Sequence, residues 1–172
     1  MAGAWVPQKH GVLMEIRFEV DGDVQLARSL SRFSDDVADL SPAFNEIVPM
    51  FYEMEAKQFA SEGAYGGVIW PKLAEATLKS RNPLSSGKIM QLSGRLVGSL
   101  IGGSERIVRV EKLSLELGTA VPYAVYHQRG GGRLPARPLI LLPESERKAW
   151  MKVIQRYLVT KMREVSKQVE DF

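Results

Sequence analysis

The chain has 172 residues, of which 45% are apolar and 25% are charged, so it is long enough to bury a core and has the composition of an ordinary folded domain. It contains no cysteine, which excludes disulfide bonds, thiolate metal sites and cysteine nucleophiles. Its uncharged stretches are far shorter than the ~18–20 residues that a membrane span requires, and residues 1–11 lack the apolar centre of a signal peptide. We therefore expect neither a membrane partner nor a targeting segment.

The charges are divided unevenly along the chain. Residues 1–71 carry 5 basic and 11 acidic side chains, whereas residues 72–172 carry 18 basic and 9 acidic ones, which together give the net charge of +3. Such a division predicts an acidic and a basic surface. The basic half could bind nucleic acid, the two surfaces could pair between neighbouring copies, or both could simply face solvent.

The first third of the chain predicts a tail, a strand and a helix. Residues 1–11 show no periodicity, and we expect an extended tail whose Trp5 contacts this domain or a neighbouring copy. Residues 12–20 alternate between apolar and polar, which predicts a half-buried strand. Apolar residues then recur at steps of four and three, which predicts a helix over residues 24–40. These apolar positions are Leu26, Leu30, Phe33, Val37 and Leu40.

The rest of the chain predicts more helices and a hairpin. Ser41 and Pro42 are typical of a helix start with Ser41 as its cap, and this helix runs to about residue 61 with a kink or break at Pro49. The further predicted elements are short helices over 73–79 and 92–101, a hairpin of strands 106–110 and 113–117, a helical turn over 122–128, a strand over 138–142 and a long helix over 144–169.

This order of elements predicts an α+β fold, in which one small antiparallel β-sheet packs against several helices, including the long C-terminal helix. We expect a single domain over residues 12–172, preceded by the tail and carrying a protruding loop at about residues 129–138.

A search for catalytic, cofactor and metal sites finds no complete set. His10 and His127 are the only histidines, and neither has a second histidine at ligand spacing. Asp35, Asp36 and Asp39 share one predicted helix face, which we interpret as solvated surface rather than as a metal site. No serine has the setting of a nucleophile elbow, and no glycine-rich run has the spacing of a phosphate loop. We therefore expect no enzyme and no cofactor.

The predicted loop concentrates arginine next to glycine. Arg129, Arg133 and Arg137 follow one another at steps of four, around the three consecutive glycines at 130–132. This pattern predicts a flexible arm that binds a phosphate backbone or the carboxylates of a neighbour, although a solvated loop would carry the same residues. Tyr123 on the preceding turn has the helical spacing of a core or interface residue.

Four short motifs follow one another along the chain. They consist of Trp70, Leu73 and Thr77; Ser93, Gly94, Leu96 and Ser99; Gly118, Thr119, Tyr123, Ala124, His127, Gln128 and Gly130; and Pro135, Ala136, Arg137 and Pro138. Taken in this order, they resemble the virion-morphogenesis or tail-completion family of tailed bacteriophages. The resemblance covers roughly residues 50–165, with Ser93 standing where threonine is usual and Leu139 where phenylalanine is common.

The resemblance implies a structural virion protein that is assembled in the host cytoplasm and completes the tail at the neck, where it joins tail to head. It further implies a homo-oligomeric ring of six or twelve copies, with six preferred, contacts with other neck and tail proteins, and genome DNA passing through the channel. A tail terminator, a head-closure protein and a nucleic-acid-binding module remain as alternatives.

On this interpretation the loop and the acidic face have paired roles. His127 and Gln128 fix the exit of the loop by hydrogen bonds, and Arg133 and Arg137 contact an adjacent subunit or another phage protein. Asp35, Asp36 and Asp39 meet basic residues of the next copy, so that ring assembly weakens with salt.

Overall fold

The computed structural model describes residues 12–17, 39–80, 87–132 and 134–170. The main elements are strand β1 (Val12–Arg17), helix α2 (Ser41–Ala60), the short helix η1 (Ala64–Gly66) and the α3, α4 and α5 helices at Glu75–Ser80, Arg95–Leu100 and Ala124–Arg129. Strands β2 (Arg106–Val110) and β3 (Ser114–Thr119) lie between α4 and α5, and α6 (Glu144–Glu170) closes the order. The predicted tail over residues 1–11 and helix over residues 24–40 fall almost wholly outside the described residues.

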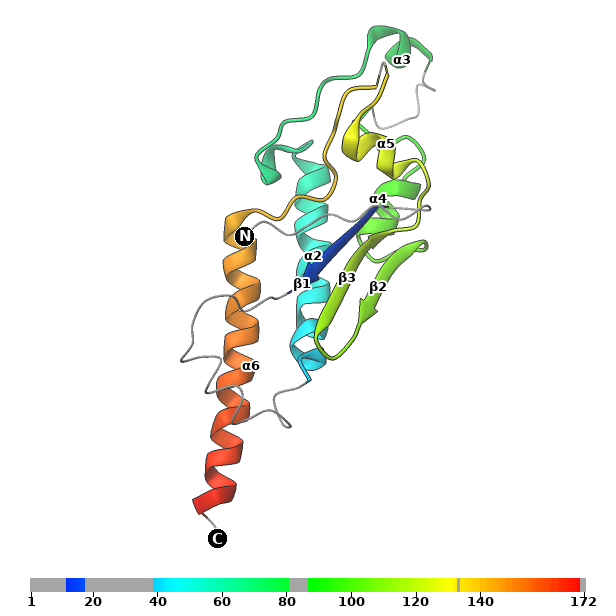
Figure 1. The fold of residues 1–172 in the computed structure, drawn as a ribbon. Coiled ribbons are helices and arrows are strands. Elements are labelled where there is room, and N and C mark those ends of the chain that lie inside the picture. Colours follow the sequence, from blue (N-terminus) through cyan, green and yellow to red (C-terminus); the bar gives the residue numbers. More distant parts are fainter. Residues whose placement is uncertain (1–11, 18–38, 81–86, 133, 171–172) are drawn as a thin grey trace.

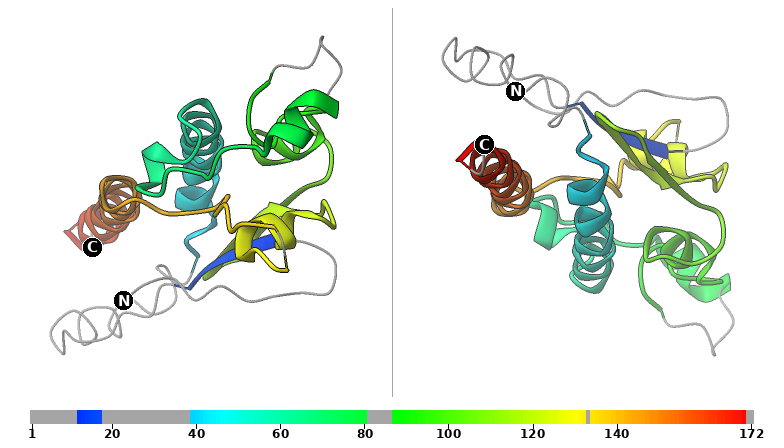
Figure 2. Two further views of the ribbon diagram at one scale, coloured as in Figure 1. Left: turned by 90° about the horizontal axis from the view of Figure 1, so that it is seen from above. Right: turned by 90° about the horizontal axis from the view of Figure 1, so that it is seen from below.

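The predicted α+β fold is confirmed. An antiparallel sheet with the order β1-β3-β2 has the hairpin strand β3 at its centre, where Val12 pairs with Thr119 and Arg106 pairs with the same residue from the other side. Helices α2 and α4 pack on one side of the sheet, and α6 packs alongside α2 (Figures 1 and 2). The result is a row of helices that faces the sheet.

The core lies between α2 and the sheet because each presents an apolar face to the other. On β3 the apolar residues alternate, and on α2 they recur at helical spacing. Leu115 and Leu117 alternate along β3 and are fully buried, whereas Glu116 between them pairs with Arg109 on the opposite face at 2.7 Å. On α2, buried residues recur at steps of three and four. These are Ala43, Phe44, Ile47, Phe51, Met54, Glu55, Gln58 and Phe59.

Helix α2 differs from its prediction at its start and its middle. It begins at Ser41, and the carboxylate of Asp39 rather than the Ser41 side chain accepts the Ser41 N–H, at 2.9 Å. These hydrogen bonds from Ser41 lower the pKa of Asp39. The predicted break at Pro49 is wrong, since the helix is continuous through this residue. Pro49 is exposed, and the buried stripe continues on both sides of it.

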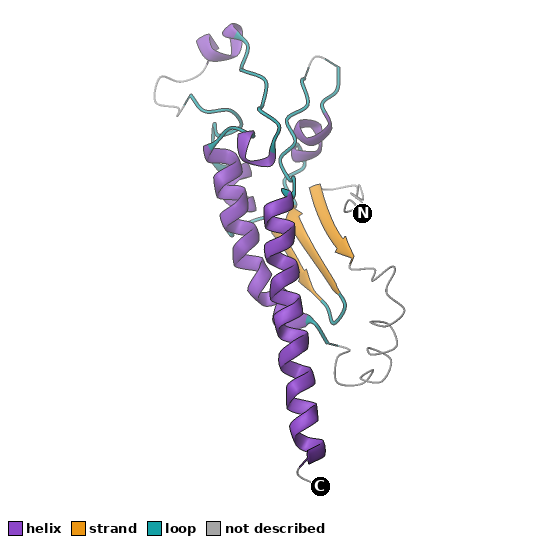
Figure 3. Ribbon diagram, turned by 90° about the vertical axis from the view of Figure 1, so that its left-hand side faces the viewer, coloured by secondary structure: helices purple, strands orange, loops and turns teal. Residues whose placement is uncertain are grey.

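Helix α6 runs antiparallel to α2, and its C-terminal part extends well past the N-terminal end of α2 (Figures 1 and 3). Three contacts join this pair of helices and the segments at their ends: Tyr65 donates to Glu146, Arg156 pairs with Glu46, and the Tyr157 hydroxyl donates to the carbonyl of Asp39 at 3.0 Å. Within the described part of the chain, no helix has the length and apolar character to cross a membrane.

The predicted strand over residues 138–142 is wrong, since this segment belongs to none of the strands in the described part of the chain. Side chains satisfy its backbone instead. The Gln128 carboxamide accepts the N–H groups of Leu139 and Ile140 at 2.6 and 3.1 Å and donates to the Ile140 carbonyl at 3.2 Å. The predicted hydrogen-bonding role of Gln128 is thus confirmed, and its partners are the residues that lead into α6.

Candidate functional site

A cleft of about 620 Å³ opens at the end of the molecule where α3, α4 and α5 gather (Figure 1). Four separate segments of the chain form it, and each of them carries one of the four motifs. Its walls are mostly apolar, and the side chains that line it include no carboxylate. The lining residues are Lys72, Leu73, Ala74, Thr77, Met90, Leu92, Ser93, Leu96, Tyr123, His127, Leu134, Pro135 and Arg137.

Trp70 fastens one wall of the cleft to the body of the protein. Its indole is 2% exposed, meets the ring of Phe59 edge-on at 5.3 Å between centroids, and donates its N–H to the Pro138 carbonyl at 2.8 Å. From this anchor residues 71–74 lead out to α3, none of whose residues is buried. The wall therefore owes its position to Trp70 rather than to packing of α3.

Arg137 joins the two walls from inside, which corrects the prediction that it reaches outward to a partner. The residue is 4% exposed, and its guanidinium donates to the carbonyls of Pro71 and Lys72 at 2.9 and 3.2 Å. A buried guanidinium needs such acceptors because the loss of water would otherwise be costly. This burial also lowers the pKa of Arg137.

The loop that follows α5 is folded back rather than extended. Gly131 and Leu134 exchange two backbone hydrogen bonds of 2.9 Å, and the Arg137 N–H donates to the His127 carbonyl at 2.7 Å. Gly130 has a φ of 71°, and a Cβ there would lie 2.7 Å from the Ala136 nitrogen. The glycines thus allow a tight return onto α5, and the predicted flexible arm is wrong for the described part of this loop.

His127 lines the cleft, and its imidazole ring has an unusual environment. Its ring meets Tyr123 edge-on at 6.1 Å between centroids, and its Nδ1 is buried and has no hydrogen-bond partner among the described residues. Burial, with a smaller contribution from the charge of Arg137, lowers the pKa of His127, so the ring is neutral at pH 7. The predicted hydrogen bond that fixes the loop comes from the main-chain carbonyl of His127 and not from its side chain.

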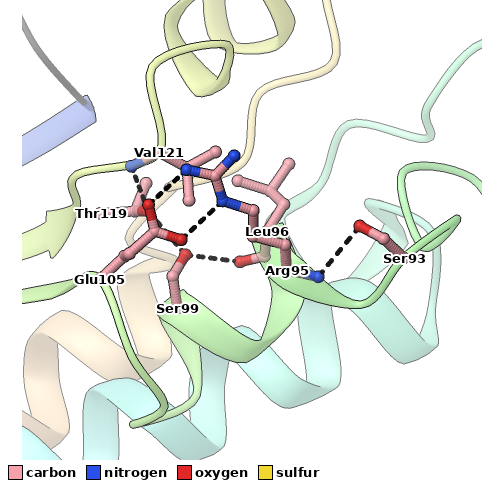
Figure 4. A network of polar contacts seen from close by, with 7 residues as sticks. All are labelled: Ser93, Arg95, Leu96, Ser99, Glu105, Thr119 and Val121. Carbon is pink, nitrogen blue, oxygen red and sulfur yellow. Dashed lines mark hydrogen bonds and ion pairs between the residues drawn. The ribbon is translucent and has the colours of Figure 1, made fainter.

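Helix α4 forms the floor of the cleft and is held to β3 by a chain of buried hydroxyl groups (Figure 4). Ser99 Oγ donates to the Leu96 carbonyl at 2.7 Å, and it lies 2.6 Å from Thr119 Oγ1, which accepts the Val121 N–H at 3.1 Å. Each hydroxyl has a single proton, so Thr119 must donate to Ser99. At the surface Arg95 binds both carboxylate oxygens of Glu105, at 2.6 and 2.5 Å.

Replacing Thr119 with valine should lower the free energy of unfolding by about 1–3 kcal/mol, because the Val121 N–H loses its acceptor inside the core. Ser99→Ala should cost a similar amount, and the double variant should cost less than the two single losses added, since both changes break the same chain of hydrogen bonds. Urea denaturation measures all three. Ser104→Ala, at an exposed serine, is the control, and strictly additive losses would contradict the shared chain.

The other predicted contact residues are divided between the cleft, other parts of the fold and undescribed segments. Tyr123 and His127 line the cleft, and Arg129 is exposed at the end of α5. Asp39 lies at the opposite end of the sheet, beside the β2–β3 turn, where the Leu40 N–H donates to the Lys112 carbonyl. Trp5, Asp35, Asp36 and Arg133 lie outside the described residues.

The cleft also contains residues that the sequence analysis did not single out for contact, namely Lys72, Met90 and Leu92. Leu92 is 61% exposed, which is large for a leucine, and within the described chain Lys72 makes no ion pair. The exposure of Leu92 cannot be read from the sequence, because Leu92 continues the helical spacing of the buried Leu96 and Leu100. The sequence likewise does not show that Lys72 lacks an ion-pair partner. No group of three potential metal ligands occurs among the described residues.

The comparisons with known proteins agree with the motifs. Residues 21–159 match the phage virion morphogenesis family, which is most of the chain. Neither a curated protein nor a solved structure matches the chain significantly. The cleft brings together the four motifs on which the resemblance rests, and it does so without a nucleophile, a base and an acid in one place. The chain therefore belongs to the phage virion morphogenesis family, and its general role is in the structure and assembly of a phage virion.

Proposed function

We propose that the protein is a tail-completion component of the phage neck, where several copies form a ring that joins tail to head. The observation that carries this proposal is the motif-lined cleft, whose apolar walls and cationic groups suit the binding of a protein segment. Contact surfaces of this kind typically include exposed apolar residues, and Leu92, which lines the cleft, is one of them. The uneven distribution of charge along the chain supports contacts between unlike surfaces.

Several basic side chains of residues 72–172 already form ion pairs within the chain, so fewer cations are available to a partner than the composition indicates. Arg95, Arg109, Arg147 and Arg156 all pair with carboxylates of the same chain. Nucleic-acid binding relies on cations that are free to replace the counterions of phosphate groups. The pairing therefore favours a protein partner over DNA as the main partner, and a gel-shift assay at low salt would detect the DNA contact if it exists.

Leu92→Glu tests the proposal in the virion. A carboxylate at this exposed position should disrupt an apolar contact without disturbing the fold, and a loss of about 2 kcal/mol would weaken the contact about thirtyfold. Cells producing the variant should accumulate separate heads and tails, counted by electron microscopy. Ile101→Glu, at an exposed residue outside the cleft, is the matched control. Complete, infectious particles made with Leu92→Glu would refute the proposal.

The position in the neck and the number of copies distinguish tail completion from tail termination and head closure. A gold or density label on the C-terminus, located in intact particles, would report both. A label inside the capsid or along the tail tube would contradict a place at the neck.

A further inference from the structure

The cleft lies at one end of the fold, and the acidic part of the chain joins the fold at the other end. Strand β3 runs from Ser114, beside the β2–β3 turn, to Thr119, and Tyr123 and His127 of the cleft follow it. Six strand residues span about 20 Å, so the two ends are well separated. Figures 1 and 3 show α3 and α5 at the end opposite the β2–β3 turn.

Residues 18–38 connect two points at the end opposite the cleft. Arg17, which precedes this segment, pairs with Ser114 at the start of β3. Asp39, which follows it, is held by the Tyr157 hydroxyl, and the Leu40 N–H binds the Lys112 carbonyl. In sequence, residues 18–38 contain five carboxylates and two arginines, as well as apolar residues spaced for a helix face.

Most acidic side chains of the described part of residues 39–71 are already engaged within the fold. Glu46 pairs with Arg156, Glu53 with Lys57, and Glu62 accepts the Ile89 N–H at 2.9 Å. Residues 18–38 hold five of the eleven carboxylates of residues 1–71, the largest group in the acidic half.

The cleft has the complementary chemistry. It offers apolar walls and the Lys72 ammonium, and its lining contains no carboxylate. Lys72 is exposed at its mouth and makes no ion pair within the described chain. Thr77 and Ser93 add hydroxyl groups. An acidic segment with apolar side chains would bury those side chains against the walls and place its carboxylates near Lys72.

We propose that the cleft of one copy receives residues 18–38 of a second copy. The contact joins two different surfaces, so it is heterologous, and repetition around an axis closes a ring if the rotation between copies allows it. This inference rests on the proposed function, since it names the partner of the same cleft. It also identifies the basic residues that Asp35 and Asp36 are expected to meet.

Site-directed cross-linking tests the contact directly, because the natural chain has no cysteine. One preparation carries Leu92→Cys, a second carries Asp36→Cys, and the mixed proteins are treated with a short bis-maleimide. Covalent dimers containing one chain of each kind are expected, at a yield well above that with Ala56→Cys, an exposed position on α2. A yield no higher than that of Ala56→Cys would overturn the proposal. So would a doubly substituted chain that links only within itself.

A charge exchange gives an independent measure of the same contact. Lys72→Glu should weaken self-association roughly tenfold or more, because the proposed attractions of residue 72 to Asp35 and Asp36 become repulsions. Sedimentation at several salt concentrations measures this change. Asp35→Lys with Asp36→Lys should do the same, and combining all three changes should restore association. Lys152→Glu, at an exposed lysine of α6 that forms no ion pair with the described residues, is the matched control. Absence of restoration would count against the pairing.

The two proposals can fail separately. If Lys72→Glu leaves self-association unchanged but still prevents the joining of heads and tails, a different phage protein occupies the cleft, and the present inference is wrong while the proposed function stands. If self-association is lost while particles are complete and infectious, the cleft contact is real but the proposed neck function is wrong.

Discussion

Glu55→Met is expected to raise the free energy of unfolding at pH 7.5 by roughly 1–3 kcal/mol, which is the usual cost of a buried polar group without a partner. Glu55 is 0% exposed on the core-facing side of α2, and neither carboxylate oxygen has a hydrogen-bond partner among the described residues. Along the helices Glu55 lies between the Tyr65–Glu146 and Glu46–Arg156 contacts. Trp150 of α6 lies between the same contacts, and its buried indole N–H likewise has no partner in the described part of the chain. Methionine keeps the length and the helix preference of glutamate.

The pH dependence of this gain follows from burial alone. Burial raises the pKa of Glu55 well above its ordinary value of 4.5, so the folded state holds the proton more tightly than the unfolded chain. The stabilisation that this proton gives is complete below pH 4.5 and is lost as the pH rises through the raised pKa of the folded state. The advantage of Glu55→Met over the natural chain should therefore grow from acidic to alkaline pH.

Urea denaturation of the natural and Glu55→Met proteins between pH 4 and pH 8.5 measures the difference in their free energies of unfolding. The contributions of groups that titrate in both proteins cancel in this difference. Glu55→Gln should reproduce part of the gain at high pH, because it is uncharged but still polar. Glu53→Met, at an exposed neighbour that pairs with Lys57, should change stability little. An advantage that does not vary with pH would show that Glu55 keeps the same protonation state in the folded and unfolded chain.

Trp70→Ala should cost about 3–5 kcal/mol of folding stability, the range for truncating a buried large aromatic side chain. The substitution removes the edge-on contact with Phe59 and the hydrogen bond to Pro138, so the wall that leads to α3 should also lose its anchor. Denaturation in guanidinium chloride measures the loss. Limited trypsin digestion should show faster cleavage at Lys72 and Lys79 than in the natural protein.

Two other variants separate the causes. Trp70→Phe keeps an aromatic ring but not the N–H donor, and it should cost about 1 kcal/mol beyond any loss of packing, since the Gln58 carboxamide also reaches the Pro138 carbonyl, at 3.3 Å. Ile69→Ala changes the preceding residue, which is exposed, and should stay within about 0.5 kcal/mol. A Trp70→Ala protein as stable as Ile69→Ala would contradict the anchoring role.

The sequence predicted those elements whose apolar period is uninterrupted. The alternation of Leu113, Leu115 and Leu117 identified β3, and the stripe that includes Trp150, Val153 and Ile154 identified α6. Residues 138–142 have the apolar character of a strand but belong to no described strand. The Gln58, Trp70 and Gln128 side chains that satisfy their backbone come from distant positions. Local pattern contains no information about such partners.

Only part of the cleft could be predicted from the sequence, again because local pattern does not reveal distant partners. The motifs identified Tyr123, His127 and Gln128, but a run of glycines with arginines predicts an exposed arm equally well whether the loop extends or folds back. Arg137 is buried because two carbonyls at residues 71 and 72 accept its guanidinium, and nothing near residue 137 in the sequence indicates them. Glu55 could have been noticed, since it lies four residues from both Phe51 and Phe59 on the apolar stripe of α2.

The strand order β1-β3-β2 has a consequence for the order of folding. The β2–β3 hairpin closes across a short turn, whereas β1 pairs with a strand about a hundred positions later in the chain. During synthesis the first strand is therefore made long before its partner exists, and the hairpin and α2 can form without it. The N-terminal strand can join the sheet only after β3 has been made, and it then adds to the finished hairpin as an edge strand.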